Sequence, residues 1–170
     1  PNVLAENCEA KSHTRVGWMR AVANVYHAFA VQSFIDELAH ARAVDPRDNL
    51  LEIIGPPRIV TPTELGIPRL PNYGQSLEQH PIDTGRMRNV VTRVTELARW
   101  SSRKEERRAL GLAAHRSFLS YVAVVVAVVR DEAGRIRVDE AWIVTDAGTI
   151  VNLERCRAQM EGAVVFGMTG

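Results

Sequence analysis

The chain has little of several features on which large classes of protein depend. It contains only two cysteines, Cys8 and Cys156, which lie far apart and form no Cys-x-x-Cys pair. Two cysteines cannot hold an iron–sulfur cluster, which requires four ligands. We expect both to be reduced and structural, with a single disulfide between them as the alternative. The formal net charge is only +1, so the chain lacks the basic bias of a nucleic-acid-binding domain.

Motifs of several other chemistries are also missing. The glycines form no Gly-x-Gly fingerprint for a dinucleotide, and no Gly-x-Ser-x-Gly elbow of a hydrolase is present. Residues 162–169 have the glycine spacing of a phosphate-binding loop, but Met168 takes the place of its lysine. The five histidines include no pair at i and i+4, so a zinc site on a helix is not expected. The longest uncharged apolar run, residues 121–129, is too short for a membrane-spanning helix, which takes about 20 residues.

What the chain does have is a helical pattern in its first hundred residues. Apolar residues recur at spacings of three and four, which places them on one face of a helix. The pattern predicts a helix over about residues 25–43 with Asn24 as its N-cap, and a short helix over residues 46–54 that starts at Asp45-Pro46. A third helix is predicted after Asp83 or Thr84. The expected core faces are Ala28, Val31, Phe34, Ile35, Leu38 and Ala39 in the first helix and Met87, Val90, Val91, Val94, Leu97 and Ala98 in the third.

The second half of the chain carries the signal of a β-sheet. Residues 121–129 are β-branched and uncharged, which predicts a strand buried on both faces. A turn at residues 131–134 and a second apolar strand over residues 135–145 complete an antiparallel hairpin. With helices covering this hairpin or sheet, the fold class is α+β. Residues 55–81 hold most of the prolines and are expected to form a long loop without a regular element.

Residues 145–170 predict the end of a strand, a turn and a final helix with Asn152 as its N-cap. Gln159 and Gly162 are neighbours on this helix, where a long amide lies beside a place that another molecule can approach closely. A helix-packing contact is the alternative. The expected core stripe consists of Leu153, Cys156, Met160, Ala163, Val164 and Gly167. Because the stripe is still running at Gly170, we expect the chain to be a piece of a larger protein.

Arg20 stands just before the first predicted helix. A fixed cation next to the free N–H groups of a helix N-terminus is an anion-binding arrangement. An ordinary surface arginine in an ion pair is the alternative.

Several stretches of the chain together resemble one protein family. One pattern, Asp-x-Gly…Val-Asn…Gln-x-Glu-Gly, is formed by Asp146, Gly148, Val151, Asn152, Gln159, Glu161 and Gly162. With residues 17–40, 81–91 and 111–123, it resembles the molybdopterin-binding subunit of the xanthine oxidase family. The branch it resembles most is the isoquinoline 1-oxidoreductase beta-subunit and aldehyde dehydrogenase type, and the resemblance covers nearly the whole chain. The chain departs from the glycine, histidine, serine, glutamate and proline that are common in that branch at Ala23, Asn24, Val25, Gln32 and Leu153 respectively.

The resemblance implies roles for particular residues. In the family, the arginine and the glutamine that correspond to Arg20 and Gln159 lie beside the molybdenum cofactor. We therefore expect Arg20, Gln159 and the adjacent Gly162 to bind this cofactor, with no protein ligand to the metal in the chain. The candidate substrate-pocket residues are Ser117, Phe118 and Tyr121, with packing of the strand as the alternative.

The resemblance also implies an activity for the complete protein. Family members are bacterial molybdenum hydroxylases, periplasmic or cytoplasmic, that oxidise aldehydes or N-heterocycles with oxygen from water and pass electrons to iron–sulfur clusters on a small partner subunit. Their catalytic base is the glutamate of a Gly-x-Gly-Glu motif, which this chain lacks. We therefore expect residues 1–170 to be one partial molybdopterin-binding domain that is inactive without the remaining segments of its own subunit. The alternatives are a catalytically silent stand-alone binding module and a purely structural domain.

Overall fold

The structure of the chain is a computed structural model that describes residues 6, 8–9, 11, 13–15, 17, 20–102 and 108–168. The elements in chain order are α1 (Asn24–Ala41), α2 (Pro46–Ile54), β1 (Ile59–Val60), β2 (Ile82–Asp83), α3 (Thr84–Leu97), β3 (Arg108–Ser117), β4 (Ser120–Arg130), β5 (Ile136–Asp146) and α4 (Leu153–Gly167). This mixture of helices and antiparallel sheet confirms the α+β prediction. No helix in the part of the chain that the structure describes is long and apolar enough to span a membrane.

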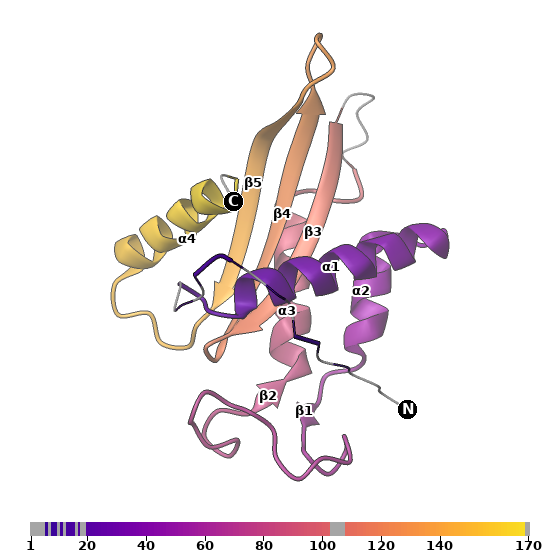
Figure 1. The fold of residues 1–170 in the computed structure, drawn as a ribbon. Coiled ribbons are helices and arrows are strands. Elements are labelled where there is room, and N and C mark those ends of the chain that lie inside the picture. The colour runs from indigo at the N-terminus through magenta and orange to yellow at the C-terminus, as the bar shows by residue number, and fades with distance from the viewer. Residues whose placement is uncertain are drawn as a thin grey trace.

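The centre of the fold is an antiparallel meander in which β3, β4 and β5 lie side by side in sequence order (Figure 1). The predicted hairpin is confirmed as β4 and β5. Strand β3 is not predicted, because the sequence pattern at residues 111–117 indicates only a segment that leads into the strand at residue 121. It pairs with β4 along its whole length and is joined to it by a two-residue turn at Phe118 and Leu119.

The hydrophobic core lies between one face of this sheet and α3. Alternate residues of β4 are buried, and they pack with the valines of α3. Each fully buried valine contributes about 1.5–3 kcal/mol through removal of its side chain from water. The core residues are Leu50, Val90, Val91, Val94, Ala98, Ala114, Tyr121, Ala123 and Val125. The other face of β4 is only half-buried, so the prediction that this strand is buried on both faces is wrong.

Helix α3 begins where the sequence predicts. Asp83 is its N-cap, and the side chain accepts hydrogen bonds from the backbone N–H groups of Gly85 at 2.7 Å and Arg86 at 3.3 Å. The predicted core face of the helix is confirmed at Val90, Val91 and Val94. Leu97 is an exception, with 58% of its surface exposed, because it is the last residue of the helix.

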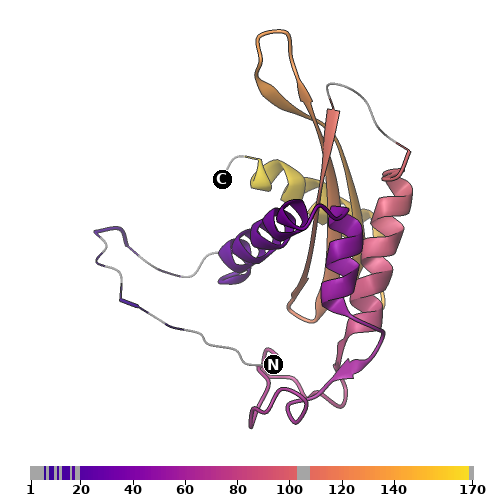
Figure 2. The same cartoon turned by 90° about the vertical axis from the view of Figure 1, so that its right-hand side faces the viewer.

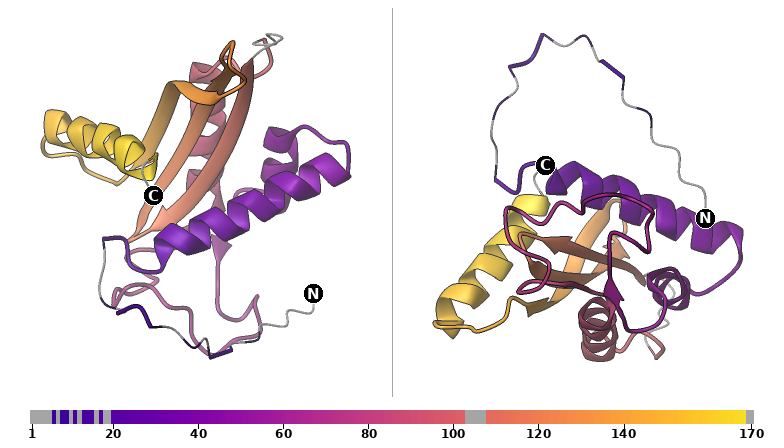
Figure 3. Two further views of the ribbon diagram at one scale, coloured as in Figure 1. Left: turned by 45° about the horizontal axis from the view of Figure 1, so that its top comes forward. Right: turned by 90° about the horizontal axis from the view of Figure 1, so that it is seen from below.

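Helix α1 crosses the opposite face of the sheet from α3 (Figure 2). The predicted core face is confirmed only in part for this helix. Ala39 is buried and Ile35 packs against the core, whereas Phe34 is 66% exposed. The helix lies over the sheet near β3 and leaves most of its circumference open (Figure 3). The N-cap prediction is also wrong, because Asn24 is the first helical residue and Ala23 precedes it without a capping side chain.

Helix α4 lies beyond β5 (Figures 1 and 3). Its Asn152 cap is confirmed by a 2.9 Å hydrogen bond from the N–H of Arg155. The predicted core stripe is wrong, because no residue of α4 is buried. Cys156, Met160 and Val164 are half-buried, whereas Leu153, Ala163 and Gly167 are exposed. One link to the sheet is the hydroxyl of Thr145, which donates to Sδ of Met160 at 2.9 Å.

The segment between α2 and α3 is mostly irregular, but the prediction that it lacks any regular element is wrong. Strand β1 pairs with β2, which closes the segment into a large loop at one end of the molecule. Both cysteines are free thiols, Cys8 exposed and Cys156 half-buried.

Asp45 joins the start of α2 to Trp100, which lies just after α3, and this gives a first prediction. Its carboxylate caps α2 by accepting from the N–H of Arg47 at 2.9 Å, and it also accepts from Nε1 of Trp100 at 3.0 Å. Substitution of Asp45 with alanine is expected to lower the free energy of unfolding by about 1–2 kcal/mol, since it removes a cap and a hydrogen-bond acceptor. Urea denaturation measures this effect. The Asp45→Asn variant, which keeps an acceptor oxygen, serves as control; an equal loss in both variants would contradict the cap.

Candidate functional site

Arg20 and Gln159, the two polar residues predicted to bind the cofactor, meet in the structure. The guanidinium of Arg20 donates a hydrogen bond to Oε1 of Gln159, although the two residues are 139 positions apart in sequence. Both side chains are exposed. A guanidinium has five N–H donors, and this bond occupies one of them. The pair therefore presents a positive charge and an amide group at the surface between α1 and α4.

The turn that carries Arg20 has an unusual backbone. Ala21 and Val22 have φ angles of 63° and 48°, in the left-handed region that side chains disfavour. For a β-branched residue such as valine this conformation is a genuine outlier. Strain of this kind costs about 1–3 kcal/mol per residue and persists only where surrounding contacts hold it.

Those contacts converge on Asn24. Its backbone N–H and its side-chain Nδ2 both donate to the carbonyl of Ala21, at 2.9 and 3.0 Å. Its Oδ1 accepts from the hydroxyl of Tyr73 at 3.1 Å and lies 2.9 Å from Nε2 of His115. One amide thus connects the turn to the large loop and to β3.

The chemistry of the Ala21 carbonyl settles the hydrogen positions around Asn24. A carbonyl oxygen only accepts, so the atom facing it is Nδ2 and the other side-chain atom is Oδ1. His115 must then carry a hydrogen on Nε2 in order to donate to Oδ1. Burial lowers the pKa of His115, and the charge of His27 lowers it further, which favours the neutral ring.

The three predicted substrate-pocket residues lie in different surroundings. Phe118 is exposed and stacks on the ring of Tyr73 with 4.7 Å between ring centroids, so it adjoins the Asn24 contacts. Ser117 is half-buried and pairs with Ser120 at the mouth of the β3–β4 turn. Tyr121 is 1% exposed and belongs to the core on the α3 side of the sheet. Phe118 therefore lies beside the Asn24 contacts, whereas Tyr121, at the same end of the sheet, faces the core on the α3 side.

Gly162 lies one turn after Gln159 on α4 and is exposed. A Cβ atom added to it would meet no other atom within 4 Å. Within the described residues nothing packs against this glycine, so the surface beside Gln159 is open to another molecule.

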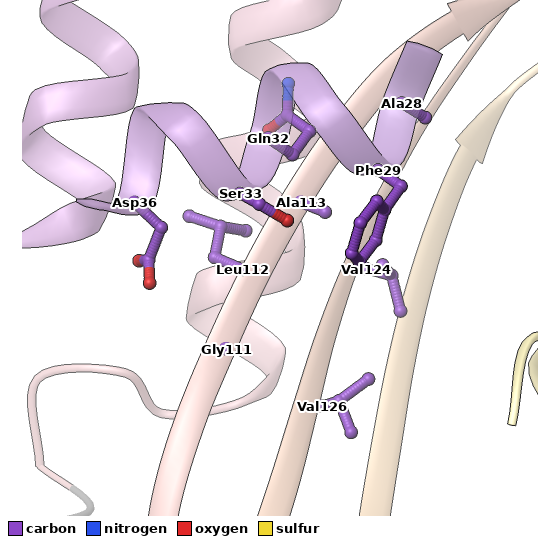
Figure 4. Close-up of a pocket in the computed structure, with 10 residues that line it drawn as sticks. All are labelled: Ala28, Phe29, Gln32, Ser33, Asp36, Gly111, Leu112, Ala113, Val124 and Val126. Atoms are coloured by element: carbon purple, nitrogen blue, oxygen red, sulfur yellow. The ribbon is translucent and has the colours of Figure 1, made fainter. Parts of the chain in front are cut away.

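A groove of about 530 Å³ lies between α1 and the outer face of β3 and β4 (Figure 4). None of the six predicted site residues lines it. Gln32, one of the departures from the resembled branch, stands on its α1 wall and accepts a 3.1 Å hydrogen bond from the N–H of Ala114. Its amide oxygen therefore satisfies a backbone donor on the free edge of β3.

Asp146, part of the motif that carries the resemblance, has a structural partner. The Nε and Nη2 atoms of Arg86 donate to its two carboxylate oxygens at 2.7 and 2.6 Å. The pair ties the start of α3 to the end of β5, the strand that leads to α4. The hydrogen bond from Arg86 is the main cause of the lowered pKa of Asp146.

Comparison with known proteins identifies the family. Residues 85–170, just over half of the chain, match the family model described as a molybdopterin cofactor-binding domain. The chain belongs to this family. The match confirms the family that the motifs predict and the molybdopterin-type cofactor.

Two curated proteins are similar to this molybdopterin cofactor-binding domain. A membrane-bound aldehyde dehydrogenase [pyrroloquinoline-quinone] from Gluconacetobacter polyoxogenes is 28% identical over 169 residues, or 94% of this chain and 20% of the relative. A nicotinate dehydrogenase subunit from Pseudomonas putida is 30% identical over 157 residues, or 89% of this chain and 12% of the relative. The chain thus spans a fifth or less of each relative's length. No solved structure matches it significantly.

The donor set around Arg20 and Gln159 fits the cofactor of this family. A guanidinium and a primary amide supply N–H groups to anionic and carbonyl oxygens, which suits an oxygen-rich anionic ligand. Within residues 20–102 and 108–168 and the few described residues before them, no group of three or more His, Cys, Asp or Glu side chains is placed to hold a metal ion.

Sequence reasoning missed Asn24, Tyr73 and His115 as parts of one cluster. They come from α1, the large loop and β3, and 49 or 91 positions separate Asn24 from its two partners. No local spacing signals such a cluster. The single hint in the sequence is Asn24 itself, which departs from the histidine common in the resembled branch.

Proposed function

We propose that this chain is part of the large subunit of a molybdenum hydroxylase that oxidises aldehydes or N-heterocycles with oxygen derived from water. The observation that carries the proposal is the contact between Arg20 and Gln159, because two residues predicted separately to bind the cofactor form one surface. The printed names of the two relatives, an aldehyde dehydrogenase and a nicotinate dehydrogenase subunit, support the substrate classes.

In this proposal the chain's own residues bind and orient the cofactor. The positive charge of Arg20 attracts anionic oxygens of the ligand, and its remaining N–H donors fix their direction. The Gln159 amide is held by Arg20 through Oε1, which leaves its NH₂ group to donate to the ligand. Gly162 permits close approach beside it. The bound cofactor supplies the redox chemistry.

The remaining parts of the enzyme come from outside this chain. The general base is expected on another segment of the same subunit, because the Gly-x-Gly-Glu motif is missing from these residues. The iron–sulfur clusters are expected on a small partner subunit, since the chain has only two cysteines. We infer that residues 1–170 alone are catalytically inactive.

Substitution of Gln159 with leucine in the complete protein tests this role. We expect molybdenum content or activity to fall by about tenfold or more, as for other residues that orient a metal centre. The measurement is metal analysis of the purified protein together with the rate of aldehyde oxidation. The control is Gln79→Leu, which changes an exposed glutamine in the large loop. If neither quantity differs from that of the control, Gln159 does not bind the cofactor.

A native mass spectrum and a cofactor analysis of the same sample test the wider proposal. A heavy assembly that contains molybdenum and further polypeptides supports a working hydroxylase. Protein without molybdenum contradicts it and favours a silent binding module or a structural domain. Pyrroloquinoline quinone must be assayed in parallel because the name of one relative includes it; its presence in place of molybdenum also contradicts the proposal.

A further inference from the structure

The strained turn at residues 20–23 needs an explanation, because its conformation is not one that its sequence prefers. A left-handed conformation is common for glycine and rare for alanine and valine, yet Ala21 and Val22 both adopt it. Without outside support the turn would relax and move the guanidinium of Arg20 away from Gln159. The support must come from contacts to the turn's backbone.

Asn24 supplies that support. Two donors of this residue, its backbone N–H and Nδ2, converge on the Ala21 carbonyl at 2.9 and 3.0 Å, which holds the carbonyl in the direction that the left-handed backbone requires. The side chain can keep this orientation because its Oδ1 is fixed from the other side by Tyr73 and His115. Both polar atoms of the Asn24 side chain, Nδ2 and Oδ1, are therefore hydrogen-bonded.

We propose that Asn24 is a positioning residue, which holds the strained turn so that Arg20 meets Gln159, and that Tyr73 and His115 orient it for this task. The expected effect of Asn24 on cofactor binding rests on the proposed function of Arg20. The mechanical part, that Asn24 holds the turn, stands on the contacts alone.

The two partners of Asn24, Tyr73 and His115, are themselves held in place, which agrees with this role. Tyr73 is itself held, since its ring stacks on Phe118 in the β3–β4 turn. His115 is half-buried and paired with Val122 within the sheet, so its ring is carried by a rigid element. The end of the meander thus fixes the Asn24 side chain, and this side chain in turn fixes the turn after Arg20.

The test combines amide hydrogen exchange with molybdenum content in the complete protein. In Asn24→Ala, exchange within residues 21–24 is expected to rise about tenfold. The backbone N–H of residue 24 still faces the Ala21 carbonyl, but the side-chain contacts that hold the turn are lost. Tyr73→Phe, which keeps the ring stacking and removes one donor to Oδ1, is expected to give a smaller rise. Amides of the α3 core should be unaffected in both variants. The matched control is Asn89→Ala, since Asn89 is exposed on α3.

A double-mutant cycle shows whether Asn24 acts through Arg20. Asn24→Ala and Arg20→Ala are each expected to lower the molybdenum content, and the double variant is expected to lower it no further than Arg20→Ala alone. Additive losses would overturn the positioning role, because a residue that acts only on general stability gives independent effects. Unchanged exchange at residues 21–24, or an equal rise throughout α3, would overturn it as well.

The two measurements separate this inference from the proposed function. If Arg20→Ala leaves the molybdenum content unchanged, the cofactor role of Arg20 fails. Faster exchange confined to residues 21–24 in Asn24→Ala would still support Asn24 as the residue that holds the turn. Should Asn24→Ala fail to fold, the exchange rates of Tyr73→Phe decide between the outcomes.

Discussion

Substitution of Tyr121 with alanine is expected to lower the free energy of unfolding by about 3–5 kcal/mol, as for other large aromatic residues removed from a core. Tyr121 is 1% exposed and has the largest fully buried side chain among the residues that the structure describes. Two cations lie over its ring, with the guanidinium carbon of Arg86 at 4.6 Å and that of Arg116 at 5.6 Å from the ring centroid. Truncation leaves a cavity and removes both cation–π contacts. Chemical denaturation of the complete protein and its variant measures the difference.

The hydroxyl of Tyr121 has a separate effect that Tyr121→Phe isolates. It accepts from the N–H of Asp83 at 2.7 Å and donates to the carbonyl of Pro81 at 3.2 Å. Because Asp83 is the N-cap of α3, the hydroxyl connects the sheet to the start of that helix. Its removal is expected to cost about 1–2 kcal/mol, since a half-buried N–H loses its partner.

The matched control for this change is Tyr26→Phe, since Tyr26 is an exposed tyrosine on α1, and it is expected to have little effect. The pair of measurements also distinguishes packing from substrate contact. If Tyr121→Phe changed KM and left stability unchanged, Tyr121 would be a pocket residue rather than a core residue.

Substitution of Asp146 with asparagine is expected to lower the free energy of unfolding by about 1–3 kcal/mol at neutral pH. The change breaks a two-bond contact with Arg86 and leaves a half-buried guanidinium without its charged partner. This loss is smaller than the ~3–5 kcal/mol expected for a fully buried ion pair, because the two side chains remain 33% and 29% exposed and solvent screens them. The control is Asp36→Asn, which alters an exposed carboxylate on α1.

The contribution of Asp146 is expected to depend on pH in a defined direction. The hydrogen bond from Arg86 lowers the pKa of Asp146 in the folded protein, so the folded state favours the ionised form. The stabilisation is therefore fully present above the ordinary aspartate pKa of about 3.9 and is lost as pH falls through the lowered folded value. Denaturation curves of the wild type and Asp146→Asn are expected to converge in that acid range. A difference that persists at acid pH would contradict this origin.

The Asp146 contact also bears on the candidate site. Arg86 holds the end of β5, and the chain then turns and enters α4, which carries Gln159. Weakening the contact is therefore expected to affect the position of Gln159 as well as stability. Asp146, the aspartate of the motif, therefore has a structural contact of its own, apart from the residues proposed to bind the cofactor.

The sequence predicts those elements that have a long apolar pattern and whose apolar face packs against another element of the same chain. Helix α3 repeats valines on one face, and β4 is nearly all valine and alanine, so the sequence predicts both elements. Strand β3 was missed because Ala109, Gly111 and Ala113 carry little strand preference; it is a strand because it pairs with β4. The core stripe predicted for α4 is wrong because only part of its apolar face is covered among the described residues. Cys156, Met160 and Val164 are half-buried, and no residue of the helix is fully buried.

The candidate site was predictable only in part. The motif resemblance predicts that Arg20 and Gln159 bind the cofactor. Gly162 is added because helical spacing makes it a neighbour of Gln159. Their direct contact could not be predicted, because it depends on how α1 and α4 are placed relative to the sheet and to each other. The same holds for Asn24, whose partners are defined by tertiary structure alone.

The order of strands in the meander has a consequence for how the chain folds. Neighbouring strands follow one another in sequence, so each pairing closes only a short loop and meets a small entropic barrier. The Arg20–Gln159 contact instead closes a loop between residues 139 positions apart, which is unfavourable until the sheet has brought the two ends together. The surface proposed to bind the cofactor is therefore expected to form late in folding, and substitutions that slow formation of the meander are expected to delay it.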